Sequence, residues 1–261
     1  MITVGIDSGS QNTKVVALRD GQLIGSVSQA TLFDVEKAAQ DALEHLLKET
    51  GLTRSEVAAI AATGAGRGRL RFIDGEVNEV IAAAQGARFM VPDCGFALEM
   101  GAEGSRAIRL NPDGSVKTYT ANDKCASGGG MFIETVARVL QLKTEELGEC
   151  AMRHTKEIPM NAQCVVFVES EVISLIHRNE SREDIAYAVL SGLSSRLGSM
   201  ARGLEISGSV AFVGGPAKNI GLVSCLEKAL KAPVVVPDRP EFAGAIGAAV
   251  HAVKLAENRG A

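Results

Sequence analysis

The sequence contains no tryptophan, and aromatic residues amount to only 4% of the chain, so its core must be built mainly from Ala, Val, Leu and Ile. A basic excess is also missing, because the net charge is −4, which argues against a nucleic-acid-binding protein. No apolar run reaches the roughly 18 residues of a membrane span. Met1–Val4 enter a predicted strand without a signal-peptide pattern. We expect a cytoplasmic protein with no nucleic-acid or membrane partner.

Cysteines are few and widely spaced, and no two of them form a Cys-x-x-Cys pair. Their odd number and the missing secretion signal argue against a disulfide framework, which leaves metal binding and buried thiols as alternatives. The cysteines are Cys94, Cys125, Cys150, Cys164 and Cys225.

The opening hairpin of the sequence recurs in the middle of the chain. Ile2–Asp7 is an apolar run that ends in an acid, and a Gly/Ser turn, a second strand and an Asp20-Gly21 hairpin follow it. Phe96–Glu99 begins the same plan, which ends in a hairpin at Asp113-Gly114. Short glycine-rich matches also arise by chance, but here the strands and hairpins agree too, so we predict an internal duplication. The aligned pairs are Asp7 with Glu99, Gly9 with Gly101, Thr13 with Ser105 and Lys14 with Arg106.

Strands mix with helices in both halves of the chain, which predicts an α/β fold of two lobes with mixed sheets. We expect the first lobe to span residues 1–92 together with a C-terminal helix within 243–261, and the second lobe to span 93–242. Between the two hairpins, the pattern predicts a helix over Phe33–Thr50, a strand over Val57–Thr63 and a helix from about Glu76 to Phe89.

The turn after each acid is suited to phosphate. Small residues let the backbone approach an anion, and the N–H groups of such a turn point toward it. Ser10 and Thr13 add hydroxyl groups, and Lys14 adds a positive charge. Because a carboxylate repels phosphate, we expect Asp7 to hold Mg²⁺ through water. A plain hairpin is the alternative for either turn taken alone.

Two later glycine-rich stretches complete a nucleotide-binding pattern. Gly214-Gly215 ends a predicted strand where the backbone could pass close to an adenine ring, and Gly244 opens a helix whose small residues permit close packing. Gly5–Ser10, Val213–Gly215 and Gly244–Ala249 resemble the phosphate, adenosine and connecting motifs of the acetate and sugar kinase/Hsp70/actin superfamily. The resemblance implies two RNase H-like lobes with an ATP cleft between them. The expected nucleotide-binding residues are Ser10, Gln11, Asn12, Thr13, Lys14, Gly101, Ala102, Gly214, Gly215, Lys218 and Gly244.

Two of the cysteines stand before predicted helices. A helix N-terminus carries about half a positive charge, which favours the thiolate form of Cys125 and Cys164 and suits them to a metal centre. An iron–sulfur cluster takes four thiolates, so a two-fold dimer could supply the set. A zinc site and buried thiols remain alternatives at this point. We expect Cys94, Cys150 and Cys225 to be buried thiols.

The stretches Asn122–Phe132 and Cys164–Ile173 resemble the activators (component A) of 2-hydroxyacyl-CoA dehydratases and the ATPase subunits of benzoyl-CoA reductase. The resemblance implies one [4Fe–4S] cluster, shared by a homodimer or by two related subunits and bound by Cys125 and Cys164. It further implies ATP and Mg²⁺ as cofactors and reduced ferredoxin or flavodoxin as electron donor. The implied partner is a second iron–sulfur enzyme, a dehydratase or reductase acting on a CoA thioester.

The second turn departs from the dehydratase activators, which show Asp-Ile-Gly-Gly-Gln-Asp where this chain has Glu99–Gly104. Glu103 replaces an amide of that pattern with a carboxylate, beside where an attacking water would sit. We therefore assign Glu103 to positioning that water, with Asp7 as the other catalytic residue. Glu169 and Glu171 could contact nucleotide, shape an interface or be solvated. A small-molecule kinase of the same superfold and a non-catalytic actin-like module are the competing functions.

Overall fold

The structure is a computed structural model, and it describes residues 1–122, 129–160, 165–206 and 208–260. The chain divides into two compact units. The first unit comprises Met1–Asp93, Asn111–Val116 and Glu241–Ala261, and the second comprises Cys94–Leu110 and Lys117–Pro240. Each unit is described by itself below.

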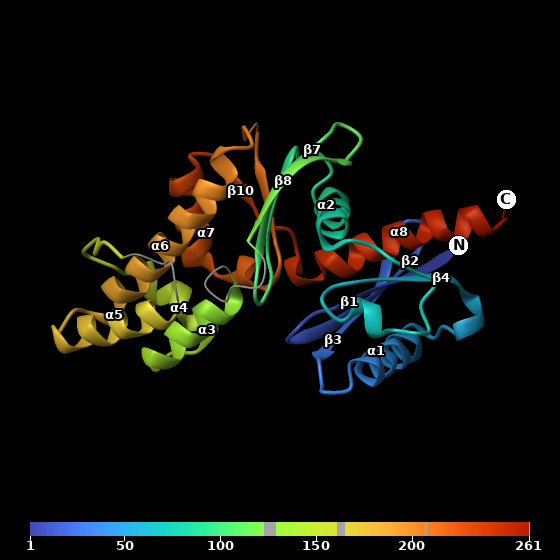
Figure 1. Cartoon of the computed structure of the whole chain (residues 1–261), viewed down its shortest axis with the longest axis horizontal. Coiled ribbons are helices and arrows are strands. Elements are labelled where there is room, and N and C mark those ends of the chain that lie inside the picture. The colour runs from blue at the N-terminus through green and yellow to red at the C-terminus, as the bar shows by residue number, and fades with distance from the viewer. Residues whose placement is uncertain (123–128, 161–164, 207, 261) are drawn as a thin grey trace. The chain divides into compact units, whose positions relative to one another are not determined.

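The first unit is a mixed sheet with helices on both faces (Figure 1). Its sheet order is β3-β2-β1-β4-β5, with β2 antiparallel and β4 parallel to β1. Along β2, Val15 and Ala17 pack with α1, whereas Val16 and Leu18 pack with α8 on the opposite face. The strands are β1 (Ile2–Ser8), β2 (Asn12–Arg19), β3 (Gln22–Ala30), β4 (Val57–Thr63) and β5 (Gly75–Glu76), and the helices are α1 (Val35–Thr50), α2 (Glu79–Met90) and α8 (Ala243–Gly260).

Helix α8 packs against its neighbours at backbone distance, which explains its richness in Ala and Gly. A Cβ atom on Gly5 of β1 would lie 1.9 Å from the Ala245 carbonyl oxygen. A Cβ on Gly247 would lie 1.8 Å from the carbonyl oxygen of Ala82 in α2. Any side chain at these positions would push α8 away from β1 or α2. The predicted close packing of the last helix is confirmed.

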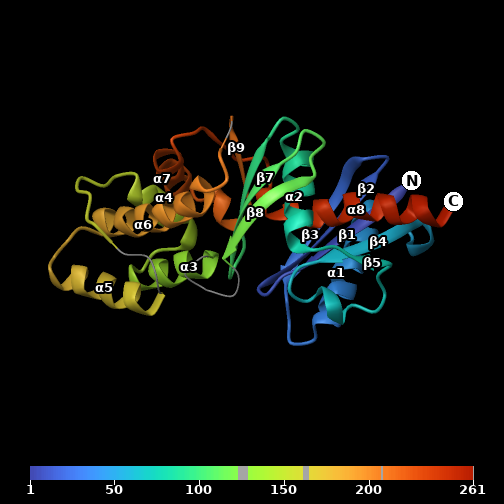
Figure 2. The same cartoon turned by 45° about the horizontal axis from the view of Figure 1, so that its top comes forward.

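The second unit joins a sheet to a group of helices, which Figure 2 shows gathered on one side of the strands. Its sheet order is β10-β9-β6-β7-β8. Phe96, Phe132 and Phe212 are fully buried in the shared core. The strands are β6 (Phe96–Met100), β7 (Ser105–Leu110), β8 (Val116–Asn122), β9 (Val210–Val213) and β10 (Val234–Val235), and the helices are α3 (Gly130–Val139), α4 (Thr144–Ala151), α5 (Val165–His177), α6 (Arg182–Arg202) and α7 (Ile220–Leu230).

The two sheets confirm the internal duplication. β6 pairs antiparallel with β7 and parallel with β9, as β1 does with β2 and β4. A glycine with positive φ directly follows β4 and β9, namely Gly64 with φ 88° and Gly214 with φ 98°. An Asn N-cap, Asn78 for α2 and Asn219 for α7, then opens the next helix in both copies. The equivalence therefore extends well beyond the two hairpins seen in the sequence.

Two predicted helix starts were wrong by a few residues. Helix α1 begins at Val35 rather than Phe33, because the Asp34 side chain caps it by accepting a hydrogen bond from the Lys37 N–H at 3.0 Å. Helix α2 begins at Glu79, because Gly75–Glu76 pairs with β4 as the short strand β5. Among the described residues, we find no helix that is both long enough and apolar enough to span a bilayer.

Candidate functional site

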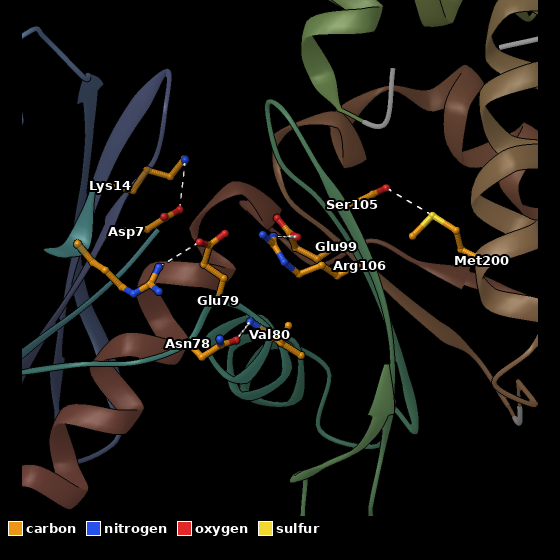
Figure 3. A network of polar contacts seen from close by, with 10 residues as sticks. Asp7, Lys14, Asn78, Glu79, Val80, Glu99, Ser105, Arg106 and Met200 are labelled. Atoms are coloured by element: carbon orange, nitrogen blue, oxygen red, sulfur yellow. Dashed lines mark hydrogen bonds and ion pairs between the residues drawn. The ribbon is translucent and has the colours of Figure 1, made fainter. Parts of the chain in front are cut away.

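The first acid–x–Gly turn lies at the end of β1 and is closed by several hydrogen bonds. The Gly9 N–H donates to the Asn12 carbonyl at 3.2 Å, and the Thr31 hydroxyl donates to the Gly9 carbonyl at 2.9 Å. Asp7 lies opposite Lys14 in the register of β1 and β2, with 3.5 Å between Lys14 Nζ and Asp7 Oδ2 (Figure 3). The lysine predicted to face phosphate therefore contacts the acid predicted to hold Mg²⁺.

Two glycines pack closely against the Asp7 carboxylate. A Cβ on Gly64 would lie 2.6 Å from Asp7 Oδ1, and a Cβ on Gly244 would lie 3.1 Å from Asp7 Oδ2. Gly244 belongs to the first turn of α8, so the carboxylate lies beside a helix N-terminus, where a negative charge is stabilised. The structure thus brings the sequence-predicted Asp7, Lys14 and Gly244 together within the first unit.

The other predicted residues of the first turn differ in exposure. Ser10 and Asn12 are exposed, and Gln11 is half-buried. Thr13 is buried, and its hydroxyl lies 2.8 Å from that of Thr31, so it stabilises the base of the turn. Ser10, Gln11 and Asn12 are therefore the side chains of this turn with access to a ligand.

A third segment supports this turn, and sequence reasoning treated it only as the end of a strand. After β4, the chain bends through Gly64, and the Gly66 N–H donates to the Ser8 carbonyl at 2.9 Å. Arg67 fixes the bend, because its Nη1 donates to the Gly64 carbonyl at 2.9 Å and pairs with Glu79 at 3.1 Å. The signal in the sequence was the pattern Thr-Gly-x-Gly directly after an apolar run.

The second turn repeats the first with a closer ion pair. Glu99 and Arg106 are register partners on β6 and β7, and Arg106 Nη1 lies 2.6 Å from Glu99 Oε2 (Figure 3). The Gly101 N–H donates to the Gly104 carbonyl at 2.8 Å and closes the turn. Glu103, predicted to position water, is exposed at the tip.

The second turn is bonded directly to the beginning of α3. The Gly130 N–H donates to the Gly101 carbonyl at 2.8 Å, and the Met131 N–H donates to the Ala102 carbonyl at 3.1 Å. A Cβ on Gly129 would lie 2.2 Å from the Ala102 carbonyl oxygen, so a side chain there would break this contact. A displacement of the turn would therefore be transmitted to the first residues of α3.

The Gly214-Gly215 stretch packs beside the second acid–x–Gly turn. A Cβ on Gly214 would lie 2.0 Å from the Met100 carbonyl oxygen, which explains why glycine is needed there. Pro216 follows, and its Cγ would lie 3.1 Å from a Cβ on Gly130. Gly214 thus lies beside the second turn, while Gly215 and Lys218 are exposed.

The cysteines fall into two groups. Cys94, Cys150 and Cys225 are buried, as predicted. Burial raises the pKa of the Cys225 thiol to about 11 and also raises the pKa of the Cys150 thiol, so neither favours the thiolate that metals bind. Cys125 and Cys164 lie outside the described residues, and α5 begins at Val165. Within the described ranges, no group of three or more His, Cys, Asp or Glu side chains is arranged to hold a metal.

The chain between α4 and Met160 is anchored by Asp184 of α6. This carboxylate accepts hydrogen bonds from the Thr155 N–H at 2.7 Å, the Lys156 N–H at 2.8 Å and the Ser181 hydroxyl at 2.6 Å. His154 stacks on Tyr187 with ring centroids 3.6 Å apart. A buried acid and an aromatic pair therefore hold residues 154–156, which precede Cys164 in the sequence.

The Asp184 carboxylate is expected to make the stability of the fold depend on pH in the acid range. The Ser181 hydroxyl and then the two backbone N–H groups lower the pKa of Asp184 from 3.8 to about 2. A folded-state pKa below the unfolded value contributes stability above about pH 3.8, and the contribution is lost as the pH falls toward about 2. We expect Asp184→Asn to lower the urea midpoint at about pH 5 and to approach wild type near pH 2. A difference that stays constant across this range would contradict this role.

These features define the class of protein. The chain has two units with the same strand order, and each unit has an acid–x–Gly turn. This arrangement is characteristic of the actin/Hsp70/sugar-kinase superfold. A ROK-family glucokinase from Streptomyces griseus shares this fold at a TM-score of 0.62, with 14% identity over 97% of this chain and 100% of that chain. The chain belongs to the BadF/BadG/BcrA/BcrD ATPase family, which it matches over residues 4–252.

Relatives cover nearly the whole chain. It is 35% identical to the activator of lactoyl-CoA dehydratase from Anaerotignum propionicum, over 99% of this chain and 100% of that protein. It is 33% identical to a benzoyl-CoA reductase subunit from Thauera aromatica, over 95% of this chain and 92% of that protein. The activator of the 2-hydroxyisocaproyl-CoA dehydratase from Clostridium difficile, solved with bound ADPNP, has a TM-score of 0.92 and 30% identity, covering 100% of this chain and 97% of that chain.

Proposed function

We propose that this ATPase is an electron-transfer activator that carries a [4Fe–4S] cluster and drives low-potential electrons into a CoA-thioester dehydratase or a benzoyl-CoA-type reductase. The observation that carries the proposal is the pair of hydrogen bonds from the first residues of α3 to the carbonyls of Gly101 and Ala102. They tie a phosphate turn to the helix that follows the Cys125 segment. We therefore propose that nucleotide state acts on the cluster ligand through the first residues of α3, which follow Cys125 closely in the sequence.

The proposed ligands are Cys125 and Cys164. The donor set of the described residues fits this assignment, because Cys94, Cys150 and Cys225 are buried, and burial raises the pKa of the Cys150 and Cys225 thiols. The two remaining cysteines provide half of the four thiolates that a [4Fe–4S] cluster takes. A homodimer, or a pseudo-symmetric dimer with a related subunit, would complete the set around one axis. When bound, such a cluster supplies one-electron redox chemistry.

ATP and Mg²⁺ are proposed to bind through the turn residues. Asp7 offers the hard carboxylate oxygen that Mg²⁺ prefers, and the neighbouring Gly64 and Gly244 add no side chain that would cover it. We assign phosphate contacts to Ser10, Gln11 and Asn12 in the first unit and to the backbone of Gly101, Ala102 and Gly214 in the second. Glu103 is proposed to orient the attacking water. Its exposure at the turn tip leaves it accessible to such a water.

Nucleotide hydrolysis matches the energetic demand of the proposed reaction. Lowering a one-electron potential by about 300 mV costs about 7 kcal/mol. Burial of a cluster alone does not supply this energy again in each catalytic cycle, whereas ATP turnover does. The proposed donor is reduced ferredoxin or flavodoxin, and the proposed acceptor is an iron–sulfur dehydratase or reductase of the kind that the relatives' names describe.

The proposal is tested by ATP-coupled electron transfer. Protein purified without oxygen is reduced, freed of excess reductant and mixed with a low-potential viologen, which takes one electron for each electron the protein loses. We expect rapid viologen reduction with MgATP, accompanied by ADP release, and slow reduction with ADP or without nucleotide. Equal rates in all three conditions would refute the proposal. Phosphate transfer to a sugar or carboxylate substrate without electron transfer would favour a kinase.

A further inference from the structure

The hydroxyl of Thr63 is a buried polar group for which the described part of the chain provides no hydrogen bond. Thr63 is the last residue of β4 and is only 2% exposed. Among the described residues, no group hydrogen-bonds its Oγ1. Buried hydroxyls are normally paired, and an unpaired one is costly to the folded state. Such a group at the end of a strand beside a phosphate turn calls for a partner that arrives with a ligand.

Thr63 and Asp7 face the same side of the first sheet. They are register partners on the parallel strands β4 and β1, so their side chains lie on one face. That face is the one covered by α8, because Ala59 and Ala61 of β4 pack against Ala252. On β1, Gly5 lies against the backbone of the same helix. The orphaned hydroxyl therefore lies on the α8 face of the sheet, next to the carboxylate.

The Asp7 carboxylate is bordered by two glycines. A Cβ on Gly64 would lie 2.6 Å from one Asp7 oxygen and a Cβ on Gly244 would lie 3.1 Å from the other, so no side chain crowds the carboxylate from these two positions. Mg²⁺ keeps several waters and takes only one or two carboxylates from a protein, beside phosphate oxygens. A hydroxyl beside the carboxylate can receive a hydrogen bond from one of those waters.

We propose that Thr63 is a positioning residue that binds a water molecule of the Mg²⁺ ion held by Asp7. This inference rests on the proposed nucleotide-binding function and assigns the cation to the first turn alone. The second copy of the repeat supports that assignment. Val213 stands opposite Glu99 where Thr63 stands opposite Asp7, so the hydroxyl is missing there. Glu99 is also held by Arg106 at 2.6 Å, compared with 3.5 Å between Lys14 and Asp7.

The test removes the hydroxyl and keeps the shape. Thr63→Val places in the first unit the residue that the second copy already has. Mn²⁺, which is visible by electron paramagnetic resonance, is titrated into the full chain with the non-hydrolysable analogue ADPNP present. Loss of a group that orients a metal ligand costs about 10–100-fold in metal affinity. We expect Thr63→Val to weaken Mn²⁺ binding by at least about 10-fold, and Thr63→Ser to restore it.

Two controls separate this role from a structural one. Ser194→Ala removes another buried hydroxyl that has no hydrogen bond among the described residues, but from the second unit, and should leave Mn²⁺ affinity unchanged. Binding of the nucleotide without metal should be equal in wild type and Thr63→Val. The unliganded melting temperature of Thr63→Val should be unchanged or higher, because an unpaired buried hydroxyl has been removed. Thr63→Ala gives a second measurement of the same deletion.

The outcomes of the titration distinguish a failure of this inference from a failure of the proposed function. Mn²⁺ affinity within twofold of wild type in both Thr63→Val and Thr63→Ala overturns the inference and leaves the proposed function standing. Weakening that Thr63→Ser does not relieve, or an equal loss in Ser194→Ala, also overturns it. A wild-type chain that binds no nucleotide overturns the proposed function and this inference together.

Discussion

Replacing Cys125 or Cys164 by Ala is expected to remove the iron from the protein completely. In the proposed homodimer, each substitution would delete two of the four thiolates of the shared cluster, and the two remaining thiolates would not hold a [4Fe–4S] cluster. The measurement is iron and acid-labile sulfide per chain after purification without oxygen, together with the visible spectrum. Affinity for ATP should stay close to wild type, because neither cysteine belongs to the turns around Asp7 or Gly101.

Matched control variants come from the buried cysteines. Cys94→Ala and Cys225→Ala delete thiols that are buried in the second unit, so they should keep full iron content at some cost in stability. If Cys125→Ala retained all of its iron, the ligand assignment would fail. Loss of iron from the Cys225 variant as well would point to general unfolding and not to a ligand role.

Asp7→Asn is expected to lower the rate of ATP hydrolysis by about 10²–10³-fold, a loss typical for removing one strong electrostatic contact to a reacting centre. The amide keeps the shape of the side chain but loses the negative charge that attracts Mg²⁺. The charge of Lys14, which lies 3.5 Å from this carboxylate, is then no longer balanced. Steady-state ADP release at saturating MgATP measures the effect.

The control for this variant is Asp20→Asn. Asp20 is an exposed acid in the hairpin after β2 and pairs with the N-terminal ammonium group, so its loss should leave ATP turnover unchanged. Circular dichroism should show the same folded content in both variants. An Asp7→Asn protein with at least half of wild-type turnover would exclude Asp7 as the metal-binding acid.

The repeated architecture could be predicted from the sequence because its signals are local. Apolar runs that end in an acid, glycines after the acid and Asp-Gly hairpins each mark a strand or a turn within a few residues. The common strand order of the two sheets confirms this prediction. The buried state of Cys94, Cys150 and Cys225 followed from the usual behaviour of a lone cysteine as a small hydrophobic residue, and it is confirmed too.

What the sequence could not provide depends on contacts between distant segments. The strand β5 exists because Gly75 and Glu76 pair with Ala61 and Ala62, and no local pattern indicates this pairing. The register of β1 and β2 places Lys14 opposite Asp7, and no local pattern indicates this ion pair. The proposed role of Thr63 depends on the burial of its hydroxyl beside that acid, which only the pairing of β1 with β4 brings about.

The most direct measurement of the central claim is the iron content of the wild-type protein, purified without oxygen, against its molar mass in solution. One cluster shared by two chains predicts about two iron atoms and two sulfides per chain in a dimeric species. A colourless, iron-free protein that still hydrolyses ATP would contradict the electron-transfer account and leave an ATPase of another purpose.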